Sequence, residues 1–61
     1  MMVEFVVWAV DCMGREFEEG MFASLEEAMA FGAQIGEEMC SEEDWFVECR
    51  VDGDFAYYVE S

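Results

Sequence analysis

The sequence predicts an α+β fold: a small antiparallel sheet of three or four strands, in the order β-β-α-β-β, with one helix packed on one face. Segments rich in Val, Phe, Trp and Tyr lie near both ends of the chain, and a stretch with helical spacing of apolar residues lies between them. A turn signal at residues 52–54 divides the last segment into a hairpin. A chain of 61 residues has room for one core, so residues 1–61 are expected to form a single domain.

The first strand is expected over residues 2–10, whose sequence MVEFVVWAV has the composition typical of a β-strand. Alternation gives two mostly apolar faces, one with Val3, Phe5, Val7 and Ala9, and the other with Glu4, Val6, Trp8 and Val10. The sequence leaves two interpretations of the second face open. Either a following connector buries it with Met21 and Phe22, or it forms an exposed patch for dimerisation or for binding a target.

A turn at residues 12–14 is expected to lead into a short edge strand over residues 15–19, whose acidic side chains would discourage pairing with other chains. Residues 20–23 are expected to form a connector. Ser24 and Glu27 then fit the S-x-x-E capping box, in which both side chains accept hydrogen bonds from unpaired backbone N–H groups. This motif predicts the start of the helix directly after Ser24.

The helix is expected to run from Leu25 to about Met39. Its apolar stripe consists of Leu25, Ala28, Met29, Gly32, Ile35, Gly36 and Met39. Gly32 and Gly36 each cost about 1 kcal/mol relative to alanine inside a helix. Because these two glycines lie four residues apart on the stripe, we expect them to permit a close approach between the helix and the sheet.

Two further strands are expected over residues 45–51 and 55–59. The hairpin between them admits two registers, because a two-residue loop pairs Val51 with Asp54 and a three-residue loop pairs Val51 with Phe55. The second register gathers the apolar residues on one face and is the preferred prediction. Its other pairs are Cys49 with Tyr57 and Val47 with Val59. The outer face then consists of Phe46, Glu48, Arg50, Ala56, Tyr58 and Glu60.

The charge of the chain is strongly one-sided, with sixteen acidic residues against Arg15 and Arg50 and a formal net charge of −14. Two cations are too few for direct nucleic-acid binding, and 56% hydrophobic residues argue against disorder. No apolar run approaches the ~18 residues of a membrane span, so no membrane association is expected. The first residues lack the basic region of a signal peptide and the cysteine count is odd, which predicts a cytoplasmic protein with reduced thiols.

The residue types that ordinary catalysis or metal binding requires are missing or badly spaced. The chain has no histidine and no close Cys-x-x-Cys pair, which disfavours zinc binding and a Ser-His or Cys-His nucleophile. The Asp-Gly-Asp sequence at residues 52–54 lacks the ligand spacing of a calcium loop and is interpreted as a turn. We therefore expect no enzyme, no catalytic residue, no metal and no cofactor. Cys49 is expected to be buried, and the role of Cys12 is left open.

The placement of the acidic clusters indicates a cationic partner. Glu37 and Glu38 fall at the carboxyl end of the expected helix, where the helix dipole disfavours an anion by about 0.3–1 kcal/mol each. Solubility requires a charge of only ~2–8, so solvation alone is the less favoured interpretation. The expected contact residues are Glu37, Glu38, Glu42, Glu43 and Asp44, followed by Glu26 and Glu27. Trp8 or Tyr58 would add an apolar anchor.

In small size, extreme acidity, abundance of aromatic residues and lack of catalytic residue types, the chain resembles the phage-encoded DNA-mimic inhibitors, which include anti-CRISPR proteins. The resemblance implies an inhibitor that occupies the cationic DNA- or RNA-binding groove of a host or defence complex, such as a CRISPR surveillance complex. It shares no motif, so no residue roles follow from it. Two alternatives stay open: a self-associating assembly module whose charge serves solubility, and an acidic accessory subunit of a basic enzyme. A monomer and a homodimer are both compatible with the sequence.

Overall fold

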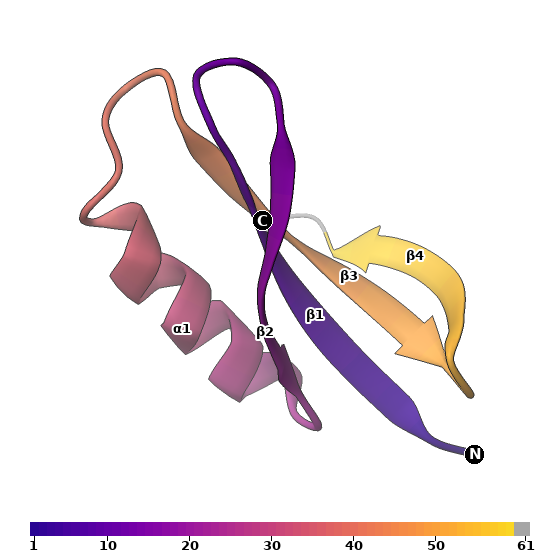
Figure 1. Cartoon of the computed structure of the whole chain (residues 1–61). Helices are drawn as coiled ribbons and strands as arrows, with labels where there is room; N and C mark the ends of the chain where they lie inside the picture. Colours follow the sequence, from indigo (N-terminus) through magenta and orange to yellow (C-terminus); the bar gives the residue numbers. More distant parts are fainter. Residues whose placement is uncertain (60–61) are drawn as a thin grey trace.

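The computed structural model describes residues 1–59 and confirms the predicted α+β architecture and element order (Figure 1). The elements are β1 (Val3–Val10), β2 (Glu16–Phe22), α1 (Leu25–Gly36), β3 (Asp44–Val51) and β4 (Asp54–Val59). The four strands form one antiparallel sheet in the order β2-β1-β3-β4. The helix α1 contacts β1, β2 and β3 and lies on one side of the sheet (Figure 1). Within residues 1–59, no helix is long and apolar enough to cross a membrane.

The core lies between α1 and the two central strands, where Val7, Ala28 and Val47 are fully buried. Val7 and Val47 are direct partners in the antiparallel ladder, so both side chains point to the helix. The partly buried residues around them are Phe5, Phe22, Met29, Phe31, Ile35, Trp45 and Val59. This arrangement leaves one face of the sheet covered and the other open.

The second strand is longer than the sequence predicted, because residues 20–22 continue β2 instead of forming a connector. Met21 pairs with Val6 and Phe22 pairs with Phe5, after a register shift between Val7 and Trp8 on β1. The extension places the Phe22 ring 5.2 Å from that of Phe31 on α1, on the covered face. Burial of this aromatic pair supplies a physical reason for the longer strand.

The helix starts where predicted and ends earlier. The Oγ atom of Ser24 accepts a hydrogen bond from the backbone N–H of Glu27 at 3.5 Å, which confirms the predicted amino-terminal cap. At the other end, α1 stops at Gly36, and the prediction that it continues to about Met39 was wrong. The N–H groups of Glu38 and Met39 bond to carbonyls three residues back, so the chain tightens into turns as it leaves the helix.

The two glycines of α1 permit the predicted close approach, and their contact is Trp45 of β3. A Cβ atom added to Gly32 would overlap the six-membered ring of this indole, and one added to Gly36 would lie 2.8 Å from its Nε1 atom. Even the smallest side chain at position 32 would therefore displace the ring or the helix.

The β3–β4 hairpin combines the two registers considered from the sequence. Asp52 and Gly53 have φ values of 53° and 85° and form a two-residue turn, which pairs Val51 with Asp54, so the preferred three-residue loop was wrong. A register shift then leaves Ala56 unpaired and restores the predicted pairs of Cys49 with Tyr57 and Val47 with Val59. As a result Phe55, the partner of Arg50, takes the place predicted for Ala56 on the outer face. Glu60 lies outside the described residues.

Candidate functional site

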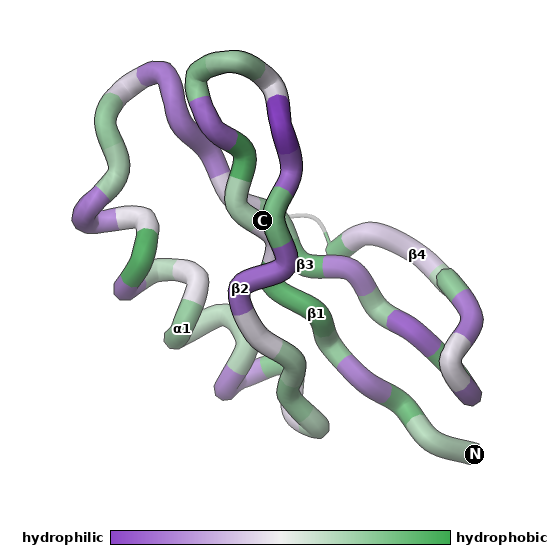
Figure 2. Tube along the Cα trace, viewed as in Figure 1, coloured by the Kyte–Doolittle hydropathy of each residue, from purple (hydrophilic) through white to green (hydrophobic). Residues whose placement is uncertain are grey.

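Two connections meet at one end of the sheet, which we call the loop end. It comprises the β1–β2 turn at residues 11–15 and the α1–β3 connection at residues 37–43, drawn side by side in Figure 1. In Figure 2 hydrophilic segments flank a hydrophobic stretch in each connection. Val10, the last residue of β1, pairs with Glu16 on one side and with Asp44 on the other. Acidic side chains from two strands, β2 and β3, and from the two connections therefore converge there.

The structure divides the predicted contact residues into two groups. Glu37 caps the carboxyl end of α1, Glu38 follows it, and the remaining three lead into β3 at the loop end. Glu26 and Glu27 lie in the first turn of α1, about 15 Å away along the helix axis. The two groups therefore occupy opposite ends of the helix and do not form one continuous cluster.

Glu43 differs from the other acids of the loop end because its carboxylate is turned into its own loop. Its Oε1 atom accepts hydrogen bonds from the backbone N–H of Cys40 at 3.1 Å and from the Cys40 thiol at 3.0 Å. These bonds lower the pKa of Glu43. Glu43 is half-buried, whereas Glu37, Glu38 and Asp44 are exposed.

A hollow of about 470 Å³ opens between the carboxyl end of α1 and the start of β3. Its lining includes Glu37, Glu43, Asp44 and the ring of Trp45. The carboxylates of Glu37 and Asp44 beside an indole favour a cationic side chain there, because opposite charges attract and the face of an aromatic ring also attracts a cation.

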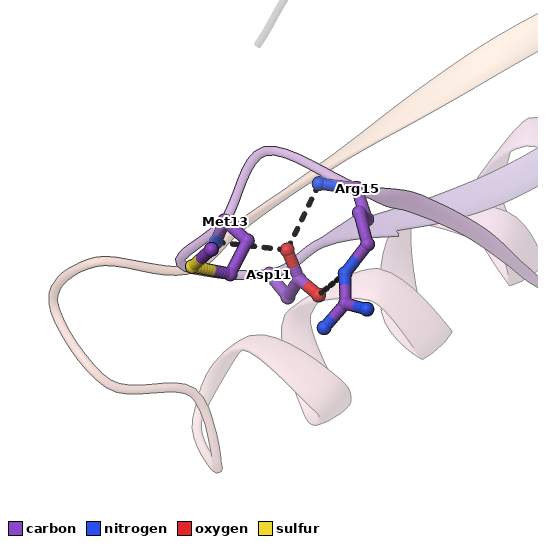
Figure 3. A network of polar contacts seen from close by, with 3 residues as sticks. All are labelled: Asp11, Met13 and Arg15. Carbon is purple, nitrogen blue, oxygen red and sulfur yellow. Dashed lines mark hydrogen bonds and ion pairs between the residues drawn. The ribbon is translucent and has the colours of Figure 1, made fainter.

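The first arginine is held inside the β1–β2 turn (Figure 3). The Oδ1 atom of Asp11 accepts hydrogen bonds from the backbone N–H groups of Met13 and Arg15, each at 2.9 Å. Its Oδ2 atom pairs with Arg15 Nε at 2.8 Å. The hydrogen bond from the backbone N–H of Arg15 is the main cause that lowers the pKa of Asp11, and burial opposes it. Arg15 therefore already has a carboxylate partner.

The second arginine, Arg50, pairs with Glu48 on the open face of the sheet. Glu48 is only 8% exposed. Arg50 Nε lies 3.1 Å from Glu48 Oε2, and the indole Nε1–H of Trp8 donates to Glu48 Oε1 at 2.8 Å. The hydrogen bond from Arg50 is the main cause that lowers the pKa of Glu48, and burial opposes it. Sequence reasoning placed Glu48 on this face but did not find its burial. The available signal was its position on the same face as Trp8, with the chain's second arginine two residues away.

Both arginines are thus used within the chain. Among residues 1–59, the ion pairs are those of Arg15 with Asp11 and of Arg50 with Glu48, and the other acids in this part of the chain have no cationic side chain within pairing distance. The negative charge at the loop end is available to an external cation.

The open face also carries a cluster of rings, Trp8, Phe46, Phe55 and Tyr58, which we call the aromatic face. The ring of Phe46 lies 6.3 Å from that of Trp8 and 5.4 Å from that of Tyr58, and Phe55 lies 4.8 Å from Tyr58. Tyr58 is 59% exposed and Phe55 is 55% exposed.

The second face of β1 is neither fully buried nor fully exposed. Val6 is fully buried, while Trp8 and Val10 are half-buried beside exposed rings. Met21 lies on this face as the partner of Val6, but Phe22 lies on the covered face and does not help to bury it.

The cysteines and acids form no metal site in the part of the chain that is described: no three potential ligands among residues 1–59 gather as they would around an ion. Cys49 is buried, as predicted, and Cys12 and Cys40 are exposed free thiols.

No protein-family model, curated protein or solved structure matches the chain, so its function has to be inferred from the geometry and chemistry of its own residues.

Proposed function

We propose that this protein is a non-enzymatic inhibitor that acts as a nucleic-acid mimic in the cytoplasm. It occupies the positively charged DNA- or RNA-binding groove of a basic host or defence complex, such as a CRISPR surveillance complex. The observation that carries the proposal is the combination of converging acids at the loop end with two arginines that are both neutralised inside the chain. Carboxylates there stand where the phosphates of the natural ligand would stand.

The charge density supports this proposal. A net charge of −14 along a longest dimension of 37 Å corresponds to about one negative charge every 3 Å. A single strand of DNA carries about one charge every 3.4 Å, and the duplex carries about one every 1.7 Å. The chain as a whole therefore carries, per unit length, an amount of negative charge comparable to that of a nucleic acid.

The proposal is tested by competition. A labelled DNA or guide–target duplex is bound to a purified CRISPR surveillance complex and to other basic nucleic-acid-binding proteins, and this protein is titrated in at several salt concentrations. We expect displacement of the nucleic acid that weakens steeply as ionic strength rises, because the contacts are electrostatic. Binding that is indifferent to salt, or no displacement from any basic protein, would contradict the proposal.

Two triple variants locate the contact. Glu37→Gln, Glu38→Gln and Glu42→Gln remove three charges from the loop end, and Glu19→Gln, Asp52→Asn and Asp54→Asn remove three charges elsewhere. We expect about tenfold weaker inhibition for the first variant and no more than about threefold for the second. Equal losses would mean that total charge matters and the loop end does not.

A second candidate function is a small self-associating module, with charge that serves solubility. The observation that favours it is the exposed aromatic face, because soluble monomers rarely leave several large rings together at the surface. Sedimentation distinguishes the candidates: a dimer that stays associated in low salt, with no basic protein bound, favours the module.

A further inference from the structure

We propose that the aromatic face is a docking surface for arginine side chains of a basic protein partner. The proposal rests on the proposed function for the existence of that partner, but it adds a second surface and the chemistry that this surface recognises. The exposed rings and the neighbouring carboxylates lie on the sheet face opposite α1, where no element of residues 1–59 covers them.

The rings form a continuous platform across three strands. The planes of Trp8 and Phe46 are nearly parallel, at 11°, whereas Tyr58 meets Phe46 edge-on at 88°. Phe55 extends the platform along β4 at an angle of 57° to Tyr58. Ring faces attract cations through their quadrupoles, and the planar guanidinium group stacks on them better than an ammonium group does.

Acids line the border of this platform. In the ladder, Glu18 is the partner of Trp8, and Glu16 and Asp44 flank Val10, so all three acids belong to the same face as the rings. A hollow of about 340 Å³ lies at this border and is lined by Glu16, Phe46 and Tyr58. A guanidinium group placed there meets a carboxylate and two aromatic rings at once, the combination for which arginine is the best suited side chain.

The chain already accommodates one guanidinium group on this face. Arg50 pairs with Glu48 by two hydrogen bonds, at 3.1 and 3.3 Å, and its ladder partner is Phe55. Arg50 is thereby neutralised and does not repel an incoming cation. Glu16, Glu18 and Asp44 remain without a cationic partner in the described chain.

Charge decides between an arginine-bearing partner and a second copy of this chain. Two copies that meet through this face would each carry a net charge of −14 and would place both acidic borders at the same interface. Like charges across an interface cost several kcal/mol, so a cationic partner complements the face and a second copy does not.

The two tryptophans allow a direct test, because Trp8 lies on the open face and Trp45 packs on the glycines of α1. The ¹⁵N-labelled protein is titrated with a nona-arginine peptide at low salt, and both indole N–H signals are followed by NMR. We expect the Trp8 signal and the amides of Phe46 and Tyr58 to shift, whereas a shift of the Trp45 signal reports peptide bound in the hollow at the loop end. A nona-lysine peptide should bind several-fold more weakly.

Adjacent tyrosines supply a matched pair of variants. Tyr58 is 59% exposed on the aromatic face, and Tyr57 is 53% exposed and pairs with Cys49 on the opposite face. We expect Tyr58→Ala to weaken binding of the nona-arginine peptide about threefold to tenfold and Tyr57→Ala to leave it unchanged within twofold. An unshifted Trp45 signal in each free variant verifies that the fold is intact.

Three results would overturn the proposal. Shifts confined to residues 37–43, with Trp8 unmoved, would refute the aromatic face and leave the loop end as the binding surface. Equal losses for the two tyrosine variants, or equal affinity for the arginine and lysine peptides, would show that the rings do not contribute. Trp8 signals that depend on protein concentration without peptide would show that a second copy covers the face. Failure of the proposed function itself would appear instead in the competition experiment.

Discussion

Each face of the sheet carries one tryptophan, and different interactions hold the two indoles in place. Trp45, on the covered face, lies against Gly32 and Gly36, and the contact is too close for a side chain at either glycine. Trp8, on the open face, donates its N–H to Glu48, which also binds Arg50. The covered face thus depends on close packing, and the open face on a charged hydrogen-bond network beside exposed rings. This contrast separates a face stabilised by close apolar packing from a face stabilised by polar bonds, which leaves large rings exposed.

The largest expected effect comes from Gly32→Ala, which tests the packing of the covered face. The added methyl group overlaps the ring of Trp45, and overpacking of this kind costs about 1–3 kcal/mol. Alanine recovers about 1 kcal/mol through its better helix propensity. Because the overlap is severe, we expect a net loss toward the upper end of the resulting range, up to about 2 kcal/mol in the free energy of unfolding, measured with urea, and a smaller loss for Gly36→Ala.

A second substitution at the contact serves as control. Combined with Trp45→Phe, which shortens the ring at that site, Gly32→Ala should cost less than it does alone, because the overlapping atoms are gone. If Gly32→Ala instead stabilises the protein, the indole of Trp45 can move aside at little cost. Close packing against the indole would then not restrict the residue at position 32.

An intermediate effect is expected for Glu48→Gln, which tests the network of the open face. Glutamine retains an acceptor for the Trp8 indole but loses the ion pair with Arg50, so we expect a loss of about 1 kcal/mol in unfolding free energy. Glu18→Gln, on the same face but exposed, is the matched control and should change stability by less than about 0.5 kcal/mol. An equal loss in both variants would mean that the network contributes nothing specific.

The smallest expected effect is the pH dependence that Glu48 adds to stability. Its pKa in the folded protein is lowered from an ordinary value of 4.5, so folding favours the charged form. This contribution is complete above about pH 4.5 and is lost as the pH falls through the lower folded pKa. The difference in unfolding free energy between the wild type and Glu48→Gln should therefore shrink below pH 4.5. A difference that stays constant down to pH 3 would contradict the role assigned to the ion pair.

Much of the fold could be predicted from local signals in the sequence. The start of α1 followed from Ser24 and its hydrogen bond to Glu27, and the close approach followed from the spacing of Gly32 and Gly36. The early end of α1 and the full length of β2 could not be predicted in the same way. The early end of α1 depends on the turns that lead the chain from the helix toward β3. The full length of β2 depends on the packing of Phe22 against Phe31 of the helix.

The candidate site could be predicted less completely. The cluster of acids around residues 37–44 and its separation from Glu26 and Glu27 along the helix could both be predicted, because they follow from spacing along one segment. That the β1–β2 turn lies beside this cluster became clear only in three dimensions. The position of Phe55 on the aromatic face depends on the unpaired residue Ala56. One extra residue in a strand moves the side chains that precede it to the opposite face of the sheet, relative to those that follow it.

The sequence by itself determined the element order, the helix cap, the buried Cys49 and the excess of anions, because these follow from composition and from spacing along a single segment. The tertiary structure alone decided that Glu48 is buried against Trp8 and Arg50, and that acids of the β1–β2 turn lie beside those that follow α1. Burial and proximity of this kind arise from pairing between residues some forty positions apart, and no local pattern of side chains encodes the register of that pairing.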